Sequence, residues 1–125
     1  MTKNTKKNDT ALIGCGYWGT NIAKVLTKVK KNKIIIYDEN RSNSLILKKR
    51  FPDKTIISKS LKNILHDNNV KNVILATPPE KNYLLLKQCI ENKKNIFIEK
   101  PGLKTYSEII KIKKIKNNKI LMFGY

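Results

Sequence analysis

The chain has 125 residues, of which 40% are hydrophobic, so it is long enough for one domain with a core of its own. Its net charge of +18 comes from 27 lysines and arginines against 9 acidic residues, an excess that is typical of nucleic-acid-binding proteins. The lysines are spread along the whole chain, however, and the sequence has no aromatic and basic pattern of an RNA-binding sheet. We therefore expect solvated lysines and no nucleic-acid partner.

Targeting signals, membrane spans and paired cysteines are not expected either. The segment Met1–Thr10 is polar and basic without an apolar core, so we expect no secretory signal peptide. No apolar run approaches the length needed to cross a membrane. Cys15 and Cys89 have neither metal-site nor disulfide spacing, which favours reduced thiols. We expect a cytoplasmic protein without metal or membrane contact, with residues 1–9 as a disordered basic arm and residues 10–125 as one domain.

The first predicted strand and helix enclose a glycine-rich motif. The strand is expected at Thr10–Ile13 and the helix at Trp18–Lys30, where apolar residues recur at helical spacing. These apolar residues are Trp18, Ile22, Val25, Leu26 and Val29. The motif reads G-x-G-x-x-G and consists of Gly14, Cys15, Gly16, Tyr17, Trp18 and Gly19. Its place between a strand and a helix is the typical context of a dinucleotide-binding turn.

Each glycine of this motif is predicted to have its own role. Gly14 permits the tight turn, Gly16 lets the backbone approach a pyrophosphate, and Gly19 lets the helix pack closely on its strand. The phosphates would lie at the helix N-terminus, where unpaired N–H groups and the helix dipole favour negative charge. The alternative is a glycine turn in an unrelated α/β protein.

An acidic residue about 20 positions after the motif completes the dinucleotide fingerprint. Asp38 ends the next predicted strand, Lys33–Tyr37, and follows Gly19 by 19 residues. A carboxylate there accepts hydrogen bonds from the adenosine ribose hydroxyls and repels a 2′-phosphate, which favours NAD over NADP. Arg41 is a basic group that would weaken this preference, so NADP stays open as the cofactor. The alternative for Asp38 is an ordinary cap at the end of a strand.

The rest of the chain alternates between predicted helices and strands. Further strands are expected at Thr55–Ser58, Asn72–Ala76, Asn95–Ile98 and Lys119–Phe123. Further helices are expected at Ser42–Arg50, in a turn that ends at His66, at Glu80–Asn92 and at Tyr106–Lys116. The first of these helices is expected to bury a stripe formed by Leu45, Ile46 and Lys49. His66 is expected to be a helix end rather than a catalyst.

This alternation predicts a doubly wound parallel sheet, the α/β Rossmann fold, with about six strands in a single domain. Right-handed crossovers place the carboxyl ends of the strands at one edge of the sheet. The segments that fall on this edge are Gly14–Gly19, Asp38, Ala76–Pro79 and Glu99–Pro101. Because ligands bind at this edge in open α/β sheets, the four segments predict one binding crevice.

In their order and spacing, these segments also resemble a known family. The motifs GCGYWG, Asp38, ATPP and EKP are similar to those of the N-terminal domain of the Gfo/Idh/MocA oxidoreductases. That family includes glucose-fructose oxidoreductase, inositol dehydrogenase and nucleotide-sugar dehydrogenases. The resemblance covers nearly the whole chain from residue 10 onward, and the pairing of ATPP with EKP makes it specific.

The resemblance implies roles for two of these segments. The turn formed by Ala76, Thr77, Pro78 and Pro79 would lie along the NAD cofactor. Lys100 would be the catalytic residue, because in this family it lies near the nicotinamide and relays a proton to or from the sugar oxygen. Glu99 would orient it, and the nicotinamide itself would carry out the hydride transfer. The alternative for Lys100 is one more solvated lysine.

Two departures from the family pattern stand out. Family members often carry a histidine a few residues after the TPP turn, and here the comparable place holds Asn82. They also have a second domain, which binds substrate and supplies a further acid or base, and these 125 residues do not contain it. We therefore expect a fragment, a truncated reading frame or half of a split enzyme, with an exposed apolar patch near strand six.

The sequence thus predicts the NAD(P)-binding domain of an oxidoreductase. It would transfer a hydride between a nicotinamide cofactor and the hydroxyl group of a sugar, polyol or nucleotide sugar, once a second domain or chain supplies the substrate site. The alternative is a non-catalytic dinucleotide-binding module that senses redox state or depends on a partner. A short-chain dehydrogenase pair of Tyr83 and Lys87 is less economical, since Tyr83 is expected to face the core. A methyltransferase would leave the EKP segment unexplained.

Overall fold

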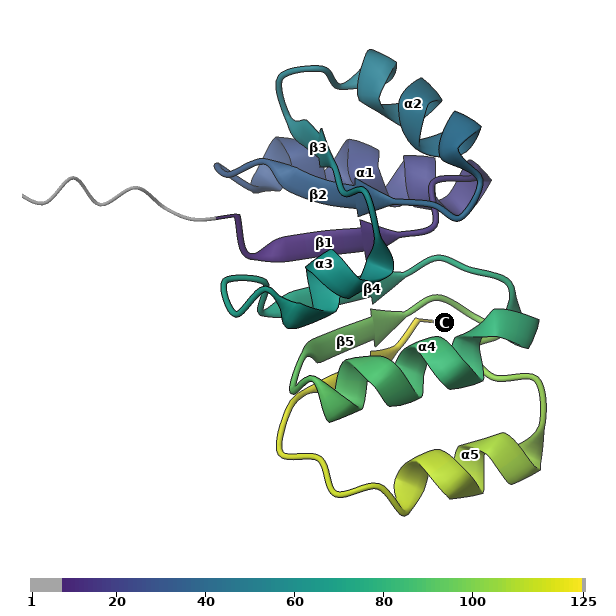
Figure 1. Cartoon of the computed structure of the whole chain (residues 1–125). Coiled ribbons are helices and arrows are strands. Elements are labelled where there is room, and N and C mark those ends of the chain that lie inside the picture. The colour runs from purple at the N-terminus through teal and green to yellow at the C-terminus, as the bar shows by residue number, and fades with distance from the viewer. Residues whose placement is uncertain (1–7, 125) are drawn as a thin grey trace, which may run out of the picture.

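The computed structural model describes residues 8–124, which alternate between strands and helices as predicted (Figure 1). The strands are β1 (Thr10–Ile13), β2 (Ile34–Tyr37), β3 (Thr55–Ile57), β4 (Asn72–Leu75), β5 (Asn95–Ile98) and β6 (Leu121–Phe123). The helices are α1 (Tyr17–Val29), α2 (Arg41–Arg50), α3 (Leu61–His66), α4 (Pro79–Glu91) and α5 (Tyr106–Lys113). Every predicted element is present, with ends displaced by a few residues at most, and His66 ends α3 as expected.

The strands form one parallel sheet of six in the order β3-β2-β1-β4-β5-β6. The central strand β1 pairs on one side with β2 and on the other with β4, so that Ala11 lies beside both Ile35 and Val73. The chain reverses its direction across the sheet between β1 and β4, the switch point of a doubly wound fold. The predicted Rossmann fold is confirmed.

Two hydrophobic clusters lie on opposite faces of this sheet. Because side chains alternate along a strand, Ala11 and Ile13 of β1 point to one face and Leu12 points to the other. The first cluster joins β1, β4 and β5 to α3, α4 and α5, and the second joins β1 and β2 to α1 and α2. Helices α4 and α5 thus cover one face, whereas α1 lies behind the sheet in Figure 1.

The buried face of α1 agrees only in part with the predicted apolar stripe, of which Ile22 and Leu26 pack against the second cluster. Trp18 is 56% exposed, and Val25 and Val29 are exposed as well. The residues that α1 buries are Gly19, Ala23 and Thr27. Small side chains occupy this face because α1 packs closely against the backbone of the glycine motif. The Thr27 hydroxyl donates to the Lys24 carbonyl at 3.2 Å, so its burial leaves no unpaired polar group.

The predicted apolar stripe of α2 is wrong. Leu45, Ile46 and Lys49 are all exposed, whereas Ser44 and Leu47 are buried against the sheet. The Ser44 hydroxyl donates to the carbonyl of Arg41 at 2.9 Å, within the same helix. A serine whose hydroxyl is hydrogen-bonded within its own helix can face the core. Its polarity in the sequence therefore does not show which face of the helix it occupies.

Asp9 lies within the segment expected to be an arm, and it contacts the rest of the domain. Its carbonyl accepts hydrogen bonds from the N–H groups of Lys71 and Asn72, at 2.8 and 3.0 Å. Its carboxylate forms an ion pair with Lys30 at 2.9 Å, which lowers the pKa of Asp9. The remainder of the expected arm, residues 1–7, lies outside the described residues.

The face of β6 opposite the first cluster is open. Leu121 and Phe123 pack against that cluster, whereas Met122 and its neighbour Phe97 on β5 point the other way. Met122 is 54% exposed and Ile120 is exposed beside it. Two exposed apolar side chains therefore lie at β6, where the apolar patch is expected.

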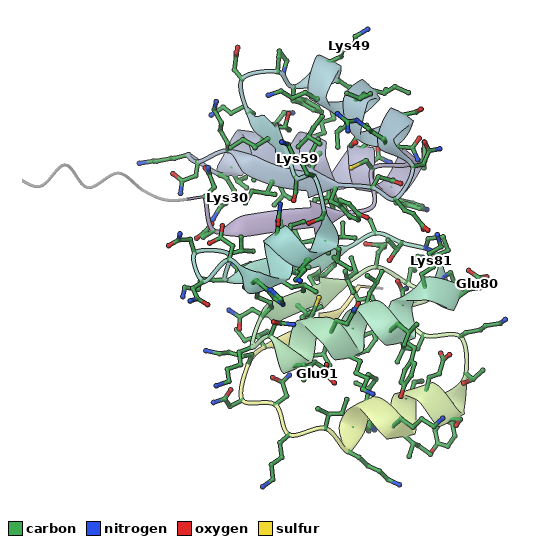
Figure 2. The ribbon with its side chains drawn as sticks, viewed as in Figure 1. Lys30, Lys49, Lys59, Glu80, Lys81 and Glu91 are labelled. Carbon is green, nitrogen blue, oxygen red and sulfur yellow. The ribbon has the colours of Figure 1, made fainter. Side chains whose placement is uncertain are left out.

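Lysines lie on many elements of the domain, and Figure 2 shows Lys49 and Lys30 on different parts of it. Cys15 and Cys89 are buried and unpaired. Among residues 8–124, no helix has both the length and the apolar character needed to cross a membrane. In the same residues, no three His, Cys, Asp or Glu side chains are grouped as metal ligands would be.

Candidate functional site

The glycine motif forms a compressed turn between β1 and α1. Gly14 has a φ of +101°, and a Cβ atom on it would lie 2.2 Å from the carbonyl oxygen of Ala76. A Cβ atom on Gly19 would lie 1.9 Å from the carbonyl oxygen of Gly14. Both contacts are with backbone atoms, so only glycine fits at these two positions. The tight turn expected at Gly14 and the close packing expected at Gly19 are what the structure shows.

Gly16 is in a different environment. A Cβ atom there would meet nothing within 4 Å, and its φ of −76° suits any residue. Gly16 is the N-cap of α1, and no side chain caps this end of the helix. The first N–H groups of a helix have no partner within it, so here they lie open toward the space beside Gly16.

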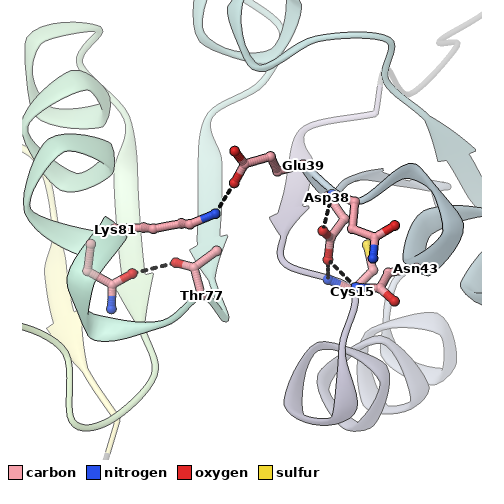
Figure 3. A network of polar contacts seen from close by, with 8 residues as sticks. Cys15, Asp38, Glu39, Asn43, Thr77 and Lys81 are labelled. Atoms are coloured by element: carbon pink, nitrogen blue, oxygen red, sulfur yellow. Dashed lines mark hydrogen bonds and ion pairs between the residues drawn. The ribbon is translucent and has the colours of Figure 1, made fainter.

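Asp38 lies at the end of β2 and already makes three hydrogen bonds (Figure 3). One carboxylate oxygen accepts from the Cys15 N–H at 2.8 Å and from the Asn43 side-chain amide at 3.3 Å. The other oxygen accepts from the Asn40 N–H at 2.8 Å. Sequence reasoning predicted a ligand contact for Asp38 and missed this anchoring of the glycine motif. Only the bond to the Asn40 N–H had a signal in the sequence, because aspartate often bonds the N–H two residues on.

The Cys15 side chain packs into the second cluster rather than toward the site. It is 4% exposed, and its thiol lies 3.6 Å from the carbonyl oxygen of Tyr37, to which it donates. Burial, together with the charge of Asp38, raises the pKa of Cys15 to about 12. The thiol is therefore neutral at physiological pH and unsuited to act as a nucleophile.

A crevice of about 1090 Å³ opens at the carboxyl edge of the sheet. The predicted site residues that line it are Gly14, Gly16, Tyr17, Trp18, Asp38, Ala76, Thr77, Pro78, Pro79, Glu99 and Lys100. Cys15 and Gly19 do not line it. Cys15 packs into the second cluster, and Gly19 packs against the backbone of Gly14. The structure thus brings the four predicted segments to one site.

One wall of the crevice was not predicted. It is formed by Lys81, Leu84, Leu85 and Gln88 of α4, together with Leu61 at the start of α3. The spacing of these α4 residues places them on one face of the helix, which was the available signal. Lys81 forms an ion pair with Glu39, across the crevice beyond the end of β2 (Figure 3). This contact raises the pKa of Lys81.

Asn82 connects two of the predicted segments. Its side-chain oxygen accepts a hydrogen bond from the Thr77 hydroxyl, and its side-chain nitrogen donates to the Gly102 carbonyl at 2.5 Å. Thr77 precedes α4, and Gly102 directly follows the EKP segment. The side chain of Asn82 is fully buried, and both of its polar atoms have a partner.

Lys100 is exposed on the turn that follows β5. Within residues 8–124 the structure shows no hydrogen bond or ion pair between Lys100 and Glu99, so the expected orientation of Lys100 by Glu99 is not seen. The Glu99 carboxylate instead lies against Gly124, where a Cβ atom would be 3.2 Å from its oxygen. Lys100 lines the crevice, and no bond with Glu99 fixes its side chain.

The comparison with known families agrees with this geometry. Residues 9–125 match the Gfo/Idh/MocA family model, which is described as the oxidoreductase family with an NAD-binding Rossmann fold. The chain belongs to the Gfo/Idh/MocA family. It is an NAD-binding Rossmann domain of that family.

Relatives of this Gfo/Idh/MocA domain are considerably longer. An uncharacterised oxidoreductase of Schizosaccharomyces pombe is 29% identical over 117 residues, which are 90% of this chain and 31% of that protein. GenD2 of gentamicin A biosynthesis, solved with NAD, is 23% identical with a TM-score of 0.80, over 98% of this chain and 36% of GenD2. The myo-inositol dehydrogenase of Lactobacillus casei, solved with NAD(H) and myo-inositol, is 19% identical with a TM-score of 0.83, over 94% of this chain and 36% of that one. The chain thus spans about a third of these relatives' length.

Proposed function

We propose that this domain holds a dinucleotide along the crevice and serves an oxidoreductase that acts on the hydroxyl group of a sugar, polyol or nucleotide sugar. The observation that carries this proposal is the open space beside Gly16, at the uncapped N-terminus of α1. A pyrophosphate in that space would accept hydrogen bonds from the first N–H groups of the helix, with its charge favoured by the helix dipole.

The adenosine half of the cofactor would lie toward Asp38. A carboxylate has about four lone-pair sites, and Asp38 uses three of them within the protein. It retains capacity to accept a hydrogen bond from a ribose hydroxyl, and its charge disfavours a 2′-phosphate. Leu61, Leu84 and Leu85, on the facing wall of the crevice, would supply apolar surface for the adenine ring.

The nicotinamide half would lie toward Thr77 and Lys100. When bound, the nicotinamide supplies the hydride chemistry. Lys100 would exchange the proton of the substrate hydroxyl, since it is the basic side chain on the EKP side of the crevice. The fold shared with a myo-inositol dehydrogenase supports a polyol or sugar hydroxyl as the substrate group. We propose that the substrate site itself is completed by residues outside these 125.

Calorimetric titration with NAD+, NADH and NADPH tests the cofactor proposal, with Gly16→Ala as the diagnostic variant. Because the added methyl group meets nothing within 4 Å, the variant should keep its fold. A loss of affinity would then come from a clash between the methyl group and the ligand. We expect about tenfold or greater weakening of NADH binding, which is at least about 1.4 kcal/mol. Lys24→Ala, an exposed change on the same helix, is the matched control.

Two results would contradict the proposal. If the wild-type chain binds none of the three nucleotides, the crevice is not a competent cofactor site on its own. If Gly16→Ala binds NADH as well as the wild type does, the pyrophosphate does not lie beside Gly16. Binding of NADH without sugar or polyol oxidation, even with a complementary substrate domain present, would favour the non-catalytic module.

A further inference from the structure

We infer that Asn82 is a positioning residue that fixes the nicotinamide half of the crevice by joining Thr77 to Gly102. The inference rests on the proposed function, because it assigns a role within the same cofactor site. It concerns the distance between two separate crevice segments, the Thr77–Pro79 turn and the Glu99–Pro101 turn. No direct hydrogen bond between these two turns is seen in residues 8–124.

One buried amide holds both turns. Asn82 lies in the first turn of α4 and is 0% exposed. It accepts from the Thr77 hydroxyl on one side and donates to the Gly102 carbonyl at 2.5 Å on the other. This position needs a side chain with one acceptor and one donor on opposite sides, which asparagine provides. Loss of either contact would leave a polar group unpaired in the interior.

The Glu99–Pro101 turn is held at both ends. Its start is fixed because the Glu99 N–H donates to the Leu75 carbonyl at 2.9 Å. Its end is fixed at Gly102, whose N–H donates to the Glu99 carbonyl at 3.0 Å. A Cβ atom on Gly102 would lie 2.9 Å from the Phe123 ring, so this residue is confined between Asn82 and β6. Lys100 lies between these fixed points, and its backbone position therefore depends on Asn82.

The hydrogen bonds that hold Asp38, at the adenosine end of the crevice, come from other residues. Asp38 contacts Cys15, Asn40 and Asn43 there, and none of these residues contacts Asn82. A change at Asn82 should therefore weaken contacts with the nicotinamide half and spare those with the adenosine half. A residue that only stabilises the fold would affect both halves alike.

The test compares NADH with ADP-ribose, which keeps the adenosine and pyrophosphate and lacks the nicotinamide. Dissociation constants for both are measured by calorimetry with the wild-type chain, Asn82→Leu and Asn82→Asp. Asn82→Asp keeps the volume and the acceptor for Thr77, but it replaces the donor to Gly102 with an acidic oxygen in a fully buried place. Circular dichroism checks that each variant is folded, and either variant that folds gives the test. Asn92→Ala is the control, because Asn92 also uses its amide in a contact on α4, with Gln88 at 2.8 Å, at the far end of the helix.

We expect both Asn82 variants to weaken NADH binding about tenfold and ADP-ribose binding less than twofold. Asn92→Ala should leave the dissociation constants of both ligands unchanged. Equal weakening of both ligands, or no weakening of NADH, would overturn the inference and leave the proposed function intact. Wild-type protein that binds NADH no more tightly than ADP-ribose would overturn it as well, because no nicotinamide contacts would then exist to position. Wild-type protein that binds neither ligand would overturn the proposed function itself.

Discussion

The carboxylate of Asp38 accepts a hydrogen bond from the Cys15 N–H at 2.8 Å, which ties the end of β2 to the glycine motif. The residue proposed to recognise the ribose is therefore also the one that holds the phosphate-binding turn. This arrangement shapes the turn before any ligand arrives, so less conformational freedom is lost on binding.

Asp38→Ala should lower both stability and cofactor selectivity. Three hydrogen bonds to the carboxylate are lost, and the Cys15 N–H is left in a partly buried place without its partner. We expect the free energy of unfolding in urea to fall by about 1–3 kcal/mol. Because the 2′-phosphate is no longer repelled, NADH should lose more affinity than NADPH in calorimetric titration. Asn43→Ala removes one of the three contacts and keeps the charge, and it should preserve the preference; an unchanged NADH to NADPH ratio in Asp38→Ala would contradict the ribose role.

Gly19→Ala should destabilise the fold even though alanine is the better helix former by about 1 kcal/mol. The added methyl group would lie 1.9 Å from the Gly14 carbonyl oxygen, and Gly14 is itself confined against Ala76. We expect a loss of about 3 kcal/mol or more in the free energy of unfolding, measured by urea titration. Gly16→Ala, in open space, should lose almost nothing. Similar free energies of unfolding for Gly19→Ala and Gly16→Ala would contradict this prediction, because the turn would then have shifted to make room for the methyl group.

Lys81→Ala should change cofactor preference rather than stability. The Lys81–Glu39 ion pair is exposed, and pairs of this kind contribute at most about 1 kcal/mol. Without Lys81, the mouth of the crevice keeps the negative charges of Asp38 and Glu39. NADPH, which carries an extra phosphate, should therefore lose more affinity than NADH, and the difference should shrink at high salt. Lys87→Ala, on the same helix but outside the crevice lining, is the control; a NADPH loss as large in this variant would point to general charge instead.

Asp9→Asn should alter the dependence of stability on pH. The hydrogen bond with Lys30 lowers the pKa of Asp9 below its ordinary value near 3.8, so the pair stabilises the fold above that pH. This contribution is lost as pH falls through the lowered pKa of the folded state. Urea titrations should show the variant less stable by a few tenths of a kcal/mol, up to about 1 kcal/mol, at pH 7, and equal to the wild type at about pH 2. A constant difference across this range would mean that the carboxylate charge is not responsible.

Much of the fold could be predicted because apolar runs mark the strands and each run ends in a turn. Residues at strand ends, such as Asp38 and Thr77, could be assigned to the crevice because parallel strands share one carboxyl edge. The buried faces of α1 and α2 could not, since Thr27 and Ser44 satisfy their hydroxyls within the helix and so face the core while looking polar in sequence.

The contacts that organise the site were also beyond sequence reasoning. The link from Asn82 to Gly102 spans 20 residues, and nothing in the spacing shows that this carbonyl faces α4. The Asp38–Cys15 contact spans 23 residues and depends on how tightly the glycine motif turns. Such bonds follow from packing that is fixed only when the whole sheet has formed.

The open face of β6 has a consequence for the colloidal behaviour of the protein. Met122 and Ile120 offer an apolar strip on a molecule that carries a net charge of +18. In dilute buffer, mutual repulsion keeps two such strips apart. Salt shortens the reach of that repulsion from about 10 Å at 0.1 M to about 3 Å at 1 M. At high salt concentration, molecules that stay separate in dilute buffer should therefore self-associate through this strip.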